Sequence, residues 1–586
     1  MHNALPNYDK FPFIKIHGPA GCVSGWKEVV AKIKAAVDQM SGKRIVAIDC
    51  YQGVLEEDLK NKLQKSLPGT FYRAADYMFA EVEIQRMVYP DTTDDEVFGY
   101  LTRLTLVQFF NQSKIARLQK EMDDQKESVI YLIGAGASLL YPNPGLIIYF
   151  DMPRWEIQLR FRENEVSNLG LSNKKQKASL RYKQAFFVDW RVLDRHKKTL
   201  MAKWDFVVDS TVPDNPKIIP GSVLNSALQY AVTRPFRLQP FFDPGPWGGQ
   251  WLKEVCGLDM NQSNFAWGFD CVPEENSLLF QFDDIIFETP SINLVFAESK
   301  RLLGEAVQAR FGDEFPIRFD FLDTMDGGNL SLQVHPTTEY AQEKFGIHYT
   351  QDESYYFLDA KEDACVYLGL EENVSPVEMI EALEVANNNG SLFEAAKYAK
   401  KWEVKKHDHI LIPAGTVHCS GKNSMVLEIS ATPYIFTFKL WDWGRMGLDG
   451  KPRPINISHG KKVIDWGFTP ERTRKELMNL CEPVSAGDGW REERTGLHER
   501  EFIETRRHWF SKTVLHHTDG SVNVLNLIEG REVIVESPTN SFEPFVVHYA
   551  ETFVIPEFVK QYNITPHGES EGQNCATIKA FVRTHA

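Results

Sequence analysis

The sequence predicts a multidomain protein with an N-terminal α/β domain followed by two β-rich domains. Its 586 residues exceed what one hydrophobic core usually supports. From about residue 11 to 220, short apolar runs alternate with long amphipathic stretches, a pattern typical of strands joined by helices. After residue 278, short β runs separated by Gly, Asn and Asp turns dominate. We therefore expect an α/β domain over 1–224 and β domains over 225–475 and 476–586.

Composition excludes several classes of partner. The 65 Lys and Arg residues stand against 80 Asp and Glu residues, and the resulting net charge of −15 disfavours general binding to nucleic acid or to an anionic membrane. Eight scattered cysteines without a CxxC pair predict a reducing compartment rather than a disulfide framework. No apolar run reaches the roughly 20 residues that a membrane helix needs. We expect a cytoplasmic protein without nucleic-acid or membrane partners.

Alternating apolar and amphipathic segments define the elements of the first domain. The expected strands are Phe13–Ile16, Arg44–Ile48, Val129–Ile133, Leu146–Phe150 and Phe206–Val208. The expected helices are Trp26–Met40, Glu56–Lys65, Asp94–Phe110 and Arg154–Phe161.

Two strand–loop–helix segments of this domain invite comparison with a phosphate-binding P-loop, which must end in Gly-Lys-Ser/Thr. The first ends in Gly25-Trp-Lys27, and the second, Ile45–Gly53, runs into an acidic stretch. Gly134-Ala-Gly136 is interpreted as a tight turn rather than a dinucleotide site. Residues 129–138 and 146–160 nevertheless resemble the latter half of uridine-kinase-like P-loop folds. That resemblance implies a degenerate, noncatalytic kinase-like domain with a regulatory or assembly role.

Turn-rich composition marks the passage to the β domains. Pro235–Gly249 is rich in Pro and Gly and reads as a linker. Val377–Lys400, rich in Ala, Glu and Lys, predicts helices inserted into the first β domain. The expected strands of the last domain include Val522–Leu527, Glu532–Val535 and Glu551–Ile555.

Four polar residues of the first β domain have the spacing of a metal site. Gln333 and His335 are two apart in a strand-like run, which places both side chains on one face. Glu353 begins another strand-like run, and His418 follows a Pro-Ala-Gly turn into a third. Strand ends can meet at one mouth of a barrel. Two imidazoles, a carboxylate and an amide oxygen suit a borderline cation such as Zn²⁺, with an open position for substrate.

Other histidines are weaker candidates. His407 and His409 repeat the two-residue spacing, but the lysines before them predict an exposed turn. His516-His517 lies beside an expected turn and is interpreted as part of a solvated loop. Neither pair is expected to bind the metal.

Ordered motifs from Pro244 to Asp465 resemble the class I phosphomannose isomerases, which are zinc cupins. The resemblance is carried by Pro246–Lys253, Phe315-Pro316, Gln333–Pro336, Thr338–Ala341, Glu353, Ile412–His418, Leu427-Glu428 and Asp449–Arg453. It implies a jelly-roll barrel with Gln333, His335, Glu353 and His418 as zinc ligands, followed by a second cupin-like barrel. The implied reaction interconverts mannose 6-phosphate and fructose 6-phosphate through a cis-enediol, with a base that moves the proton between C2 and C1.

Several cationic positions depart from the family pattern. Asp320 stands where bacterial relatives carry a lysine, and Gln351-Asp352 replaces a stretch that often holds another. Lys439 occupies the position of an arginine implicated in catalysis, and it lacks that residue's bidentate fork. Glu428 has two possible interpretations, as an acid/base catalyst or as a structural carboxylate.

Arg318, Arg445, Lys451 and Arg453 are the candidates that could restore phosphate recognition. Lys439 and Glu428 are the catalytic candidates.

Three functions remain open. The first is a metal-dependent isomerase of mannose 6-phosphate or of another sugar. The second is a catalytically silent metal cupin that binds a sugar or sugar phosphate. The third is a bifunctional chain with a working N-terminal kinase. The sequence leaves the metal, the substrate and the oligomeric state open.

Overall fold

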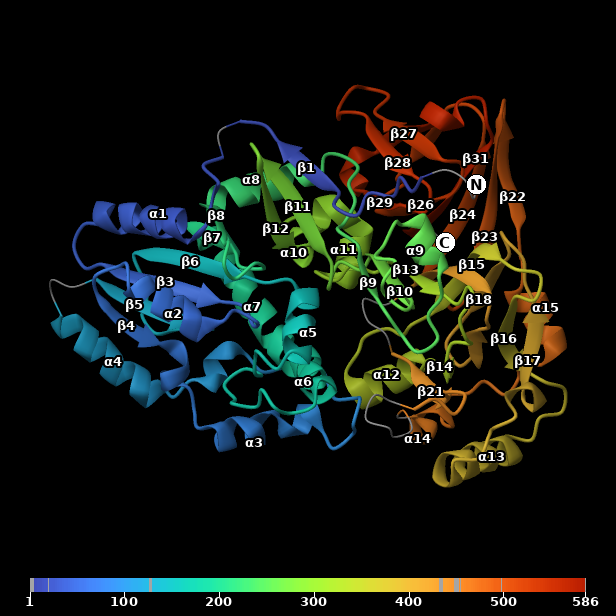
Figure 1. Cartoon of the computed structure of the whole chain (residues 1–586), viewed down its shortest axis with the longest axis horizontal. Helices are drawn as coiled ribbons and strands as arrows, with labels where there is room; N and C mark the ends of the chain where they lie inside the picture. The colour runs from blue at the N-terminus through green and yellow to red at the C-terminus, as the bar shows by residue number, and fades with distance from the viewer. Residues whose placement is uncertain are drawn as a thin grey trace.

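The computed structural model of the protein describes residues 5–18, 20–125, 129–431, 436–446, 453, 455–496 and 498–584. Figure 1 shows an α/β body at one end of the long axis and β sheets at the other. Helices α10 (Ile292–Leu303) and α11 (Glu305–Phe311) lie between them. The predicted multidomain architecture, α/β followed by β, is confirmed.

A seven-stranded sheet with the order β2-β8-β7-β6-β3-β5-β4 forms the α/β body. Its five strands from β4 to β7 are parallel, and β8 and β2 are antiparallel additions at one edge. The strands are β2 (Val23–Ser24), β3 (Ile45–Cys50), β4 (Thr70–Arg73), β5 (Ile130–Gly134), β6 (Leu146–Asp151), β7 (Phe206–Asp209) and β8 (Lys217–Pro220).

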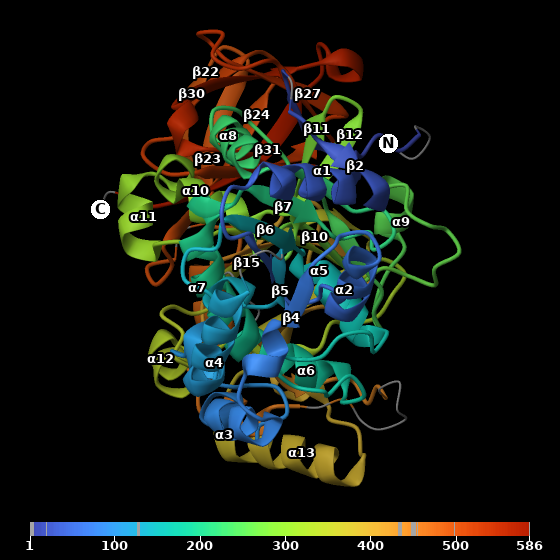
Figure 2. The ribbon, with the colours of Figure 1, turned by 90° about the vertical axis from the view of Figure 1, so that its left-hand side faces the viewer.

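Helices flank this sheet. They are α1 (Trp26–Gln39), α2 (Glu56–Gln64), α3 (Glu81–Thr92), α4 (Gln112–Asp124), α5 (Arg154–Arg162), α6 (Ala178–Gln184), α7 (Trp190–Leu200) and α8 (Gly221–Ala231). Figure 2 looks at the body from its free end and shows α2 on one side of the strands and α4 and α7 on the other. Central strands β3, β5 and β6 are buried along their whole length, as continuous apolar runs in parallel sheets require.

The first β domain consists of two sheets. The six-stranded sheet has the order β18-β15-β20-β13-β10-β9 and the five-stranded sheet the order β17-β16-β19-β14-β21. The strands are β9 (Phe241–Asp243), β10 (Trp267–Cys271), β13 (Arg318–Asp323), β14 (Leu332–Val334), β15 (Glu353–Ala360), β16 (Cys365–Leu370), β17 (Ala399–Glu403), β18 (His409–Ile412), β19 (His418–Ser420), β20 (Ser424–Ser430) and β21 (Phe438–Trp441). Its helices are α9 (Trp251–Val255), α12 (Thr338–Phe345), α13 (Pro376–Asn389), α14 (Ile457–Gly460) and α15 (Pro470–Leu477).

The second β domain repeats the two-sheet plan. Its sheets have the orders β22-β23-β24-β31-β26-β29 and β25-β30-β27-β28. The strands are β22 (Glu482–Gly487), β23 (Trp490–Gly496), β24 (Ile503–Phe510), β25 (Val514–His517), β26 (Asn523–Glu529), β27 (Glu532–Glu536), β28 (Phe545–His548), β29 (Thr552–Ile555), β30 (Gln561–Pro566) and β31 (Cys575–Val582). The three strands predicted here are confirmed as β26, β27 and β29 within two residues at each end.

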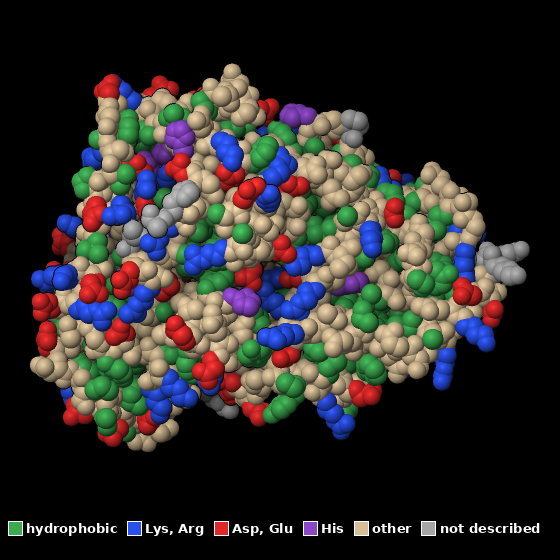
Figure 3. All heavy atoms as spheres, turned by 180° about the vertical axis from the view of Figure 1, so that it is seen from behind, with side chains coloured by type: hydrophobic (Ala, Val, Ile, Leu, Met, Phe, Trp, Pro, Cys, Tyr) green, Lys and Arg blue, Asp and Glu red, His purple; other side chains and the backbone are tan. Residues whose placement is uncertain are grey.

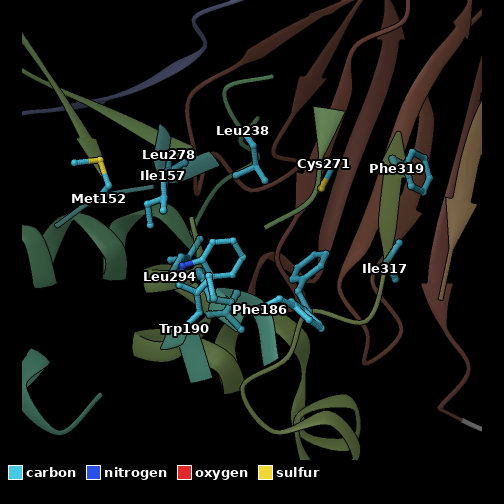
Figure 4. Close-up of a cluster of buried hydrophobic side chains, with 14 of the residues drawn as sticks. Met152, Ile157, Phe186, Trp190, Leu238, Cys271, Leu278, Leu294, Ile317 and Phe319 are labelled. Atoms are coloured by element: carbon cyan, nitrogen blue, oxygen red, sulfur yellow. The ribbon is translucent and has the colours of Figure 1, made fainter. Parts of the chain in front are cut away.

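A continuous apolar core joins the α/β body to the first β domain. Figure 4 shows Trp190 and Phe186 of the α/β body close to Leu294 of α10, with Ile317 and Phe319 of the first β domain on the other side of the view. All of these side chains belong to one buried cluster. The two bodies therefore share a hydrophobic interior rather than a hydrated interface.

The first strand departs from its expected place. β1 (Phe13–Ile16) forms as predicted, but it pairs in parallel with β11 (Ser277–Phe282) instead of joining the α/β sheet. β12 (Ile285–Pro290) completes this small sheet. The N-terminal segment thus reaches past the α/β body, because its alternating apolar side chains find their partner far along the chain.

Two helix predictions need correction. The helix expected over Asp94–Phe110 is wrong, because Asp95 Oδ1 accepts hydrogen bonds from the N–H groups of Val97, at 2.8 Å, and Phe98, at 2.7 Å, and so turns the chain. The inserted helix over 377–400 is confirmed only as α13, since Ala399 already begins β17. All eight cysteines are free thiols, and none of the helices in the described ranges is long and apolar enough to cross a membrane.

Candidate metal centre and catalytic residues

The two sheets of the first β domain bring His335, Glu353 and His418 together. Glu353 begins β15 in one sheet, whereas His335 follows β14 and His418 begins β19 in the other. One donor atom from each of the three lies within 4.8 Å of the others. All three side chains are buried. We call these residues the His–Glu–His cluster.

Hydrogen bonds to the backbone orient both imidazoles. Nδ1 of His335 donates to the carbonyl of Phe436 at 2.7 Å, and Nδ1 of His418 donates to the carbonyl of Thr416 at 2.8 Å. This arrangement turns each Nε2 toward the cluster, and Nε2 is the ring nitrogen whose lone pair can bind a metal when it carries no proton.

Those lone pairs face a carboxylate. Nε2 of His335 lies 3.2 Å from Oε2 of Glu353, and Nε2 of His418 lies 2.9 Å from Oε1. Nε2 of His335 and Oε1 of Glu353 are buried without a hydrogen-bond partner among the described residues. Acceptor atoms at such distances repel one another unless a proton or a cation lies between them. Two imidazoles and a carboxylate are the donor set of a zinc-type ion, so the residues fit a divalent metal.

Gln333 lies beside the cluster. It is directly opposite His418 across the β14–β19 pair, and its Nε2 is 3.2 Å from Nε2 of His418. A half-turn of the amide exchanges Nε2 for Oε1, the atom that can bind a cation. The structure thus brings all four predicted ligand residues into one buried group.

A row of acids and one arginine lines the same interior. In the β15–β20–β13 ladder, Glu428 is opposite Tyr355 on one side and Asp320 on the other, and Arg318 lies in the next row. Arg318 Nε is 3.2 Å from Asp320 Oδ1, and both residues are 2% exposed. Burial first, then the charges of Asp320 and Glu353, raise the pKa of Glu428 well above its usual range. These surroundings therefore favour the neutral, protonated form of Glu428.

Lys439 approaches the group from β21. It is the antiparallel partner of Gln333, so the two side chains leave the same face of the sheet. Burial lowers the pKa of Lys439 to about 8, with help from the positive charge of Arg453. No described residue accepts a hydrogen bond from its Nζ atom. A half-buried amine that is easily deprotonated can act as a base.

Arg445 and Arg453 share one carboxylate near Lys439. Arg445 Nη2 lies 2.7 Å from Asp442 Oδ1, and Arg453 Nη1 lies 2.9 Å from Oδ2. Arg445 and Arg453 are two of the cations proposed to restore phosphate recognition, and both lie near Lys439. A third, Arg318, lies beside Asp320 and Glu428. Lys451 lies outside the described residues.

Gln351 and Phe436 are site residues that sequence reasoning missed. Gln351 Nε2 donates to Glu353 Oε2 at 2.8 Å, and its Oε1 accepts from the N–H of Phe436 at 2.7 Å. The peptide groups of Phe436 therefore hold both Gln351 and His335. Gln351 was noted only as the replacement of a lysine, and no local signal in the sequence marks Phe436.

The other histidines differ from their predicted settings. His409 is wholly buried in β18 rather than exposed, while His407 lies in a turn and is half-buried. His516 is buried in β25, stacked on Tyr562 with ring centroids 5.1 Å apart, so the solvated-loop interpretation is wrong for it. The alternation of β25 explains this, because every second side chain enters the barrel. None of these histidines joins a three-residue metal group within the described ranges.

The glycine turn of the α/β domain binds the chain's own carboxylates. Asp49 Oδ1 accepts from the N–H of Gly136 and Oδ2 from that of Ser138, both at 3.0 Å. Glu56 Oε1 accepts from the N–H of Ala135 at 2.9 Å. These backbone donors at the carboxyl edge of a parallel sheet are the kind that hold phosphate groups in other α/β proteins.

Comparisons with known proteins match two different parts of the chain. Residues 25–233 match the model of a family described as a domain of unknown function, DUF8485. The chain is 26% identical to the mannose-6-phosphate isomerase ManA of Bacillus subtilis over 241 residues, which are 41% of this chain and 71% of that protein. It is also 26% identical to the mannose-6-phosphate isomerase of Streptococcus mutans over 238 residues, 40% of this chain and 69% of the relative.

A solved structure of the Bacillus subtilis mannose 6-phosphate isomerase covers 59% of this chain and 99% of its own, with a TM-score of 0.48 and 19% identity. On the strength of the sequence relatives, about 40% of the chain, in its C-terminal part, is homologous to the mannose-6-phosphate isomerases.

Proposed function

We propose that the chain is a divalent-metal-dependent aldose–ketose isomerase that interconverts mannose 6-phosphate and fructose 6-phosphate. The observation that carries the proposal is the meeting of His335, Glu353 and His418 within 4.8 Å in the domain homologous to these isomerases. Gln333 would be the fourth ligand and Zn²⁺ the preferred ion. When bound, the metal would polarise the sugar oxygens on which negative charge develops.

The chain's own residues would move and hold the protons. Lys439, with its pKa lowered to about 8, would take the proton from C2 and return it at C1. Glu428 would remain a neutral acid and would donate a hydrogen bond toward the developing oxyanion. Gln351 would keep Glu353 oriented through its 2.8 Å hydrogen bond.

A silent sugar-binding cupin is the second candidate. It is favoured by Asp320, which pairs with Arg318 in the position where relatives carry a lysine, and which leaves the interior rich in acids. Such a protein would bind a sugar or sugar phosphate without exchanging its C2 proton.

One experiment separates the two. Protein of known metal content is incubated with mannose 6-phosphate in D₂O, and a parallel sample receives free mannose. Proton NMR that shows deuterium at C2 together with formation of the ketose supports the isomerase. Binding without exchange in either sample rejects it and favours the silent cupin. Exchange with free mannose alone would move the substrate to an unphosphorylated sugar.

For the α/β part we propose a noncatalytic, kinase-like domain spanning residues 1–224, followed by cupin domains over 225–475 and 476–586. The order β4-β5-β3-β6-β7 places the first parallel strand, β3, in the middle of the sheet, with ligand-binding loops expected beyond its carboxyl end. Asp49 and Glu56 occupy the backbone donors there, which supports a domain without phosphate-transfer activity.

A further inference from the structure

A cavity of about 320 Å³ lies between the α/β body and the first β domain. Its walls come from α5, α7, the turn after β10, α10, the end of α11 and the segment before β15. On the face opposite to that of Figure 1, Lys and Arg side chains gather around a hollow near the middle of the molecule (Figure 3). Arg154, Arg191, Arg195, Lys198 and Arg310 line the cavity, and we call it the arginine cavity.

Helix α7 presents a charged stripe to this space. Arg191, Asp194, Arg195 and Lys198 follow one another at helical spacings of three, one and three residues, so they share one face. The position of this stripe is fixed because the opposite face of α7 is buried, with Trp190, Val192 and Leu193 in the core. The cations are thus held by a rigid element.

Arg154 is a buried cation with unused donors. It is 2% exposed and pairs with Asp194 through Nη2. Its Nε and Nη1 atoms are buried and make no hydrogen bond with the described residues. Donors of this kind normally find an acceptor in the protein, a water or a ligand.

Three other guanidinium groups lack a carboxylate partner. Among the described residues no Asp or Glu oxygen lies within 4.0 Å of Arg191, Arg195 or Arg310. Arg195 donates to the carbonyls of Thr102 and Leu104, each at 2.7 Å, and Arg191 donates through Nε to a carbonyl at 3.2 Å. Neutral carbonyls leave these positive charges uncompensated.

Acids in the wall do not balance the charge. Asp194 is already paired with Arg154, and Lys198 is 2.8 Å from Asp313. Burial raises the pKa of Glu274 to about 8, which favours its neutral form. Five cations and four carboxyl groups therefore line this cavity, although the protein as a whole has a net charge of −15.

We propose that the arginine cavity binds a phosphomonoester dianion. Its volume suits a small phosphorylated molecule, and planar guanidinium forks match phosphate oxygens in pairs. The unused donors of Arg154 and the guanidinium groups of Arg191 and Arg310, which have no carboxylate partner among the described residues, could receive the oxygens of such a group. The sequence relatives of the isomerase region do not account for this cavity, because Arg154, Arg191, Arg195 and Lys198 belong to the segment that matches the domain of unknown function.

The cavity is linked to the His–Glu–His cluster through a short stretch of chain. Tyr349 forms part of its wall, and Gln351, two residues on, holds Glu353 at 2.8 Å. The phosphate could thus belong to the isomerase substrate itself or to a second molecule that adjusts the isomerase site. Both ligands would present the same phosphate group to the cavity, and enzyme kinetics distinguish between them.

Phosphate binding to the full-length, chelator-treated protein tests the proposal without relying on turnover. Calorimetric titration with inorganic phosphate at low salt should show one site per chain. The double variant Arg191→Gln/Arg310→Gln should bind about tenfold more weakly or worse, since each charged hydrogen bond is worth about 1.5–3 kcal/mol. Both side chains are at least partly exposed, so the fold should persist, and the single variants provide a check. Arg117→Gln, an exposed cation of α4, is the matched control and should bind like the wild type.

Wild-type affinity in the double variant, or no phosphate binding by the unaltered protein, would overturn the proposal. If phosphate competes with mannose 6-phosphate and the double variant raises KM for that sugar but not for mannose, the cavity holds the substrate's own phosphate. If phosphate changes kcat without competing, and the double variant removes that change, the cavity holds a second ligand. Failure of the isomerase reaction itself leaves the calorimetric result intact, so the two proposals fail separately.

Discussion

Gln333 lies directly opposite Lys439 on the antiparallel strands β14 and β21. Directly opposed residues of a sheet place their side chains on the same face. Strand pairing therefore places the amine of Lys439 on the same face of the sheet as the metal-ligand candidate Gln333, although the two residues are far apart in the sequence. This pairing makes Lys439 the most direct target for testing the catalytic proposal.

Replacing Lys439 with Met should lower kcat by roughly 10²–10⁴-fold, the usual contribution of a general base. Metal content measured by mass spectrometry should stay at the wild-type level, since the four ligands are untouched. Lys439→Arg keeps the charge but not the titration near pH 8, so it should remain impaired if Lys439 is the base, whereas wild-type turnover would show that only the positive charge of the arginine found in the resembling family is needed. Turnover of Lys439→Met within about twofold of the wild type would remove Lys439 from the mechanism.

The lowered pKa of Lys439, about 8, predicts the pH profile. As the base form accumulates, kcat/KM should rise with pH and level off above about 8. Stability should change in the same direction. An unfolded lysine titrates near pH 10.4, so between about 8 and 10.4 the unfolded state binds a proton that the folded state does not, and stability rises with pH. Chemical unfolding at several pH values should show this rise in the wild type and a weaker one in Lys439→Met.

His418→Ala should abolish stoichiometric metal binding and activity, because it removes one imidazole of the His–Glu–His cluster. His409→Ala is the matched control. It removes another fully buried histidine of the same domain, so it should lower the melting temperature while keeping the metal. Chelation should lower the melting temperature of the wild type but not of His418→Ala. Equal metal content in both variants would contradict the ligand assignment.

Glu428→Gln tests the neutral acid. Because the raised pKa of Glu428 favours its protonated form, glutamine should preserve its shape and charge, and the melting temperature should change little. If the carboxyl group only donates a hydrogen bond, glutamine keeps a donor and kcat should fall modestly, whereas transfer of its proton predicts a fall of about 100-fold, with little change in KM in either case. Undiminished kcat would assign Glu428 a structural role.

The α/β domain should not bind MgATP, since Asp49 and Glu56 occupy the backbone donors of its glycine turn. A thermal-shift titration should therefore be flat. Asp49→Ala should destabilise the protein by about 1–3 kcal/mol, because it leaves the N–H groups of Gly136 and Ser138 without acceptors. A saturable rise in melting temperature with MgATP would restore the kinase alternative.

Local patterns predicted the elements that local forces determine. β6 and α5 were located within one residue at each end, because apolar runs and amphipathic periods mark them directly. The helix predicted over Asp94–Phe110 failed because one side chain, Asp95, redirects the backbone. Such a competition between a side-chain hydrogen bond and a helix leaves little trace in composition.

The candidate metal ligands could be proposed from the sequence, because spacing places Gln333 and His335 on one face and the family resemblance points to Glu353 and His418. The residues that surround these ligands could not be proposed from the sequence. The role of Phe436 rests on two backbone hydrogen bonds, to His335 and Gln351, and any residue type could supply them. The arginine cavity depends on where α7 and α11 are placed relative to each other, which no pattern within either helix specifies.

The parallel pairing of β1 with β11 has a consequence for biosynthesis. Phe13 takes its final neighbour only after Leu279 has left the ribosome. Until then, residues 13–16 lack their partner strand and stay accessible to chaperones and proteases while the α/β body is translated and folds. The pairing of β1 with β11 thus joins the start of the chain to a segment that is synthesised more than 260 residues later.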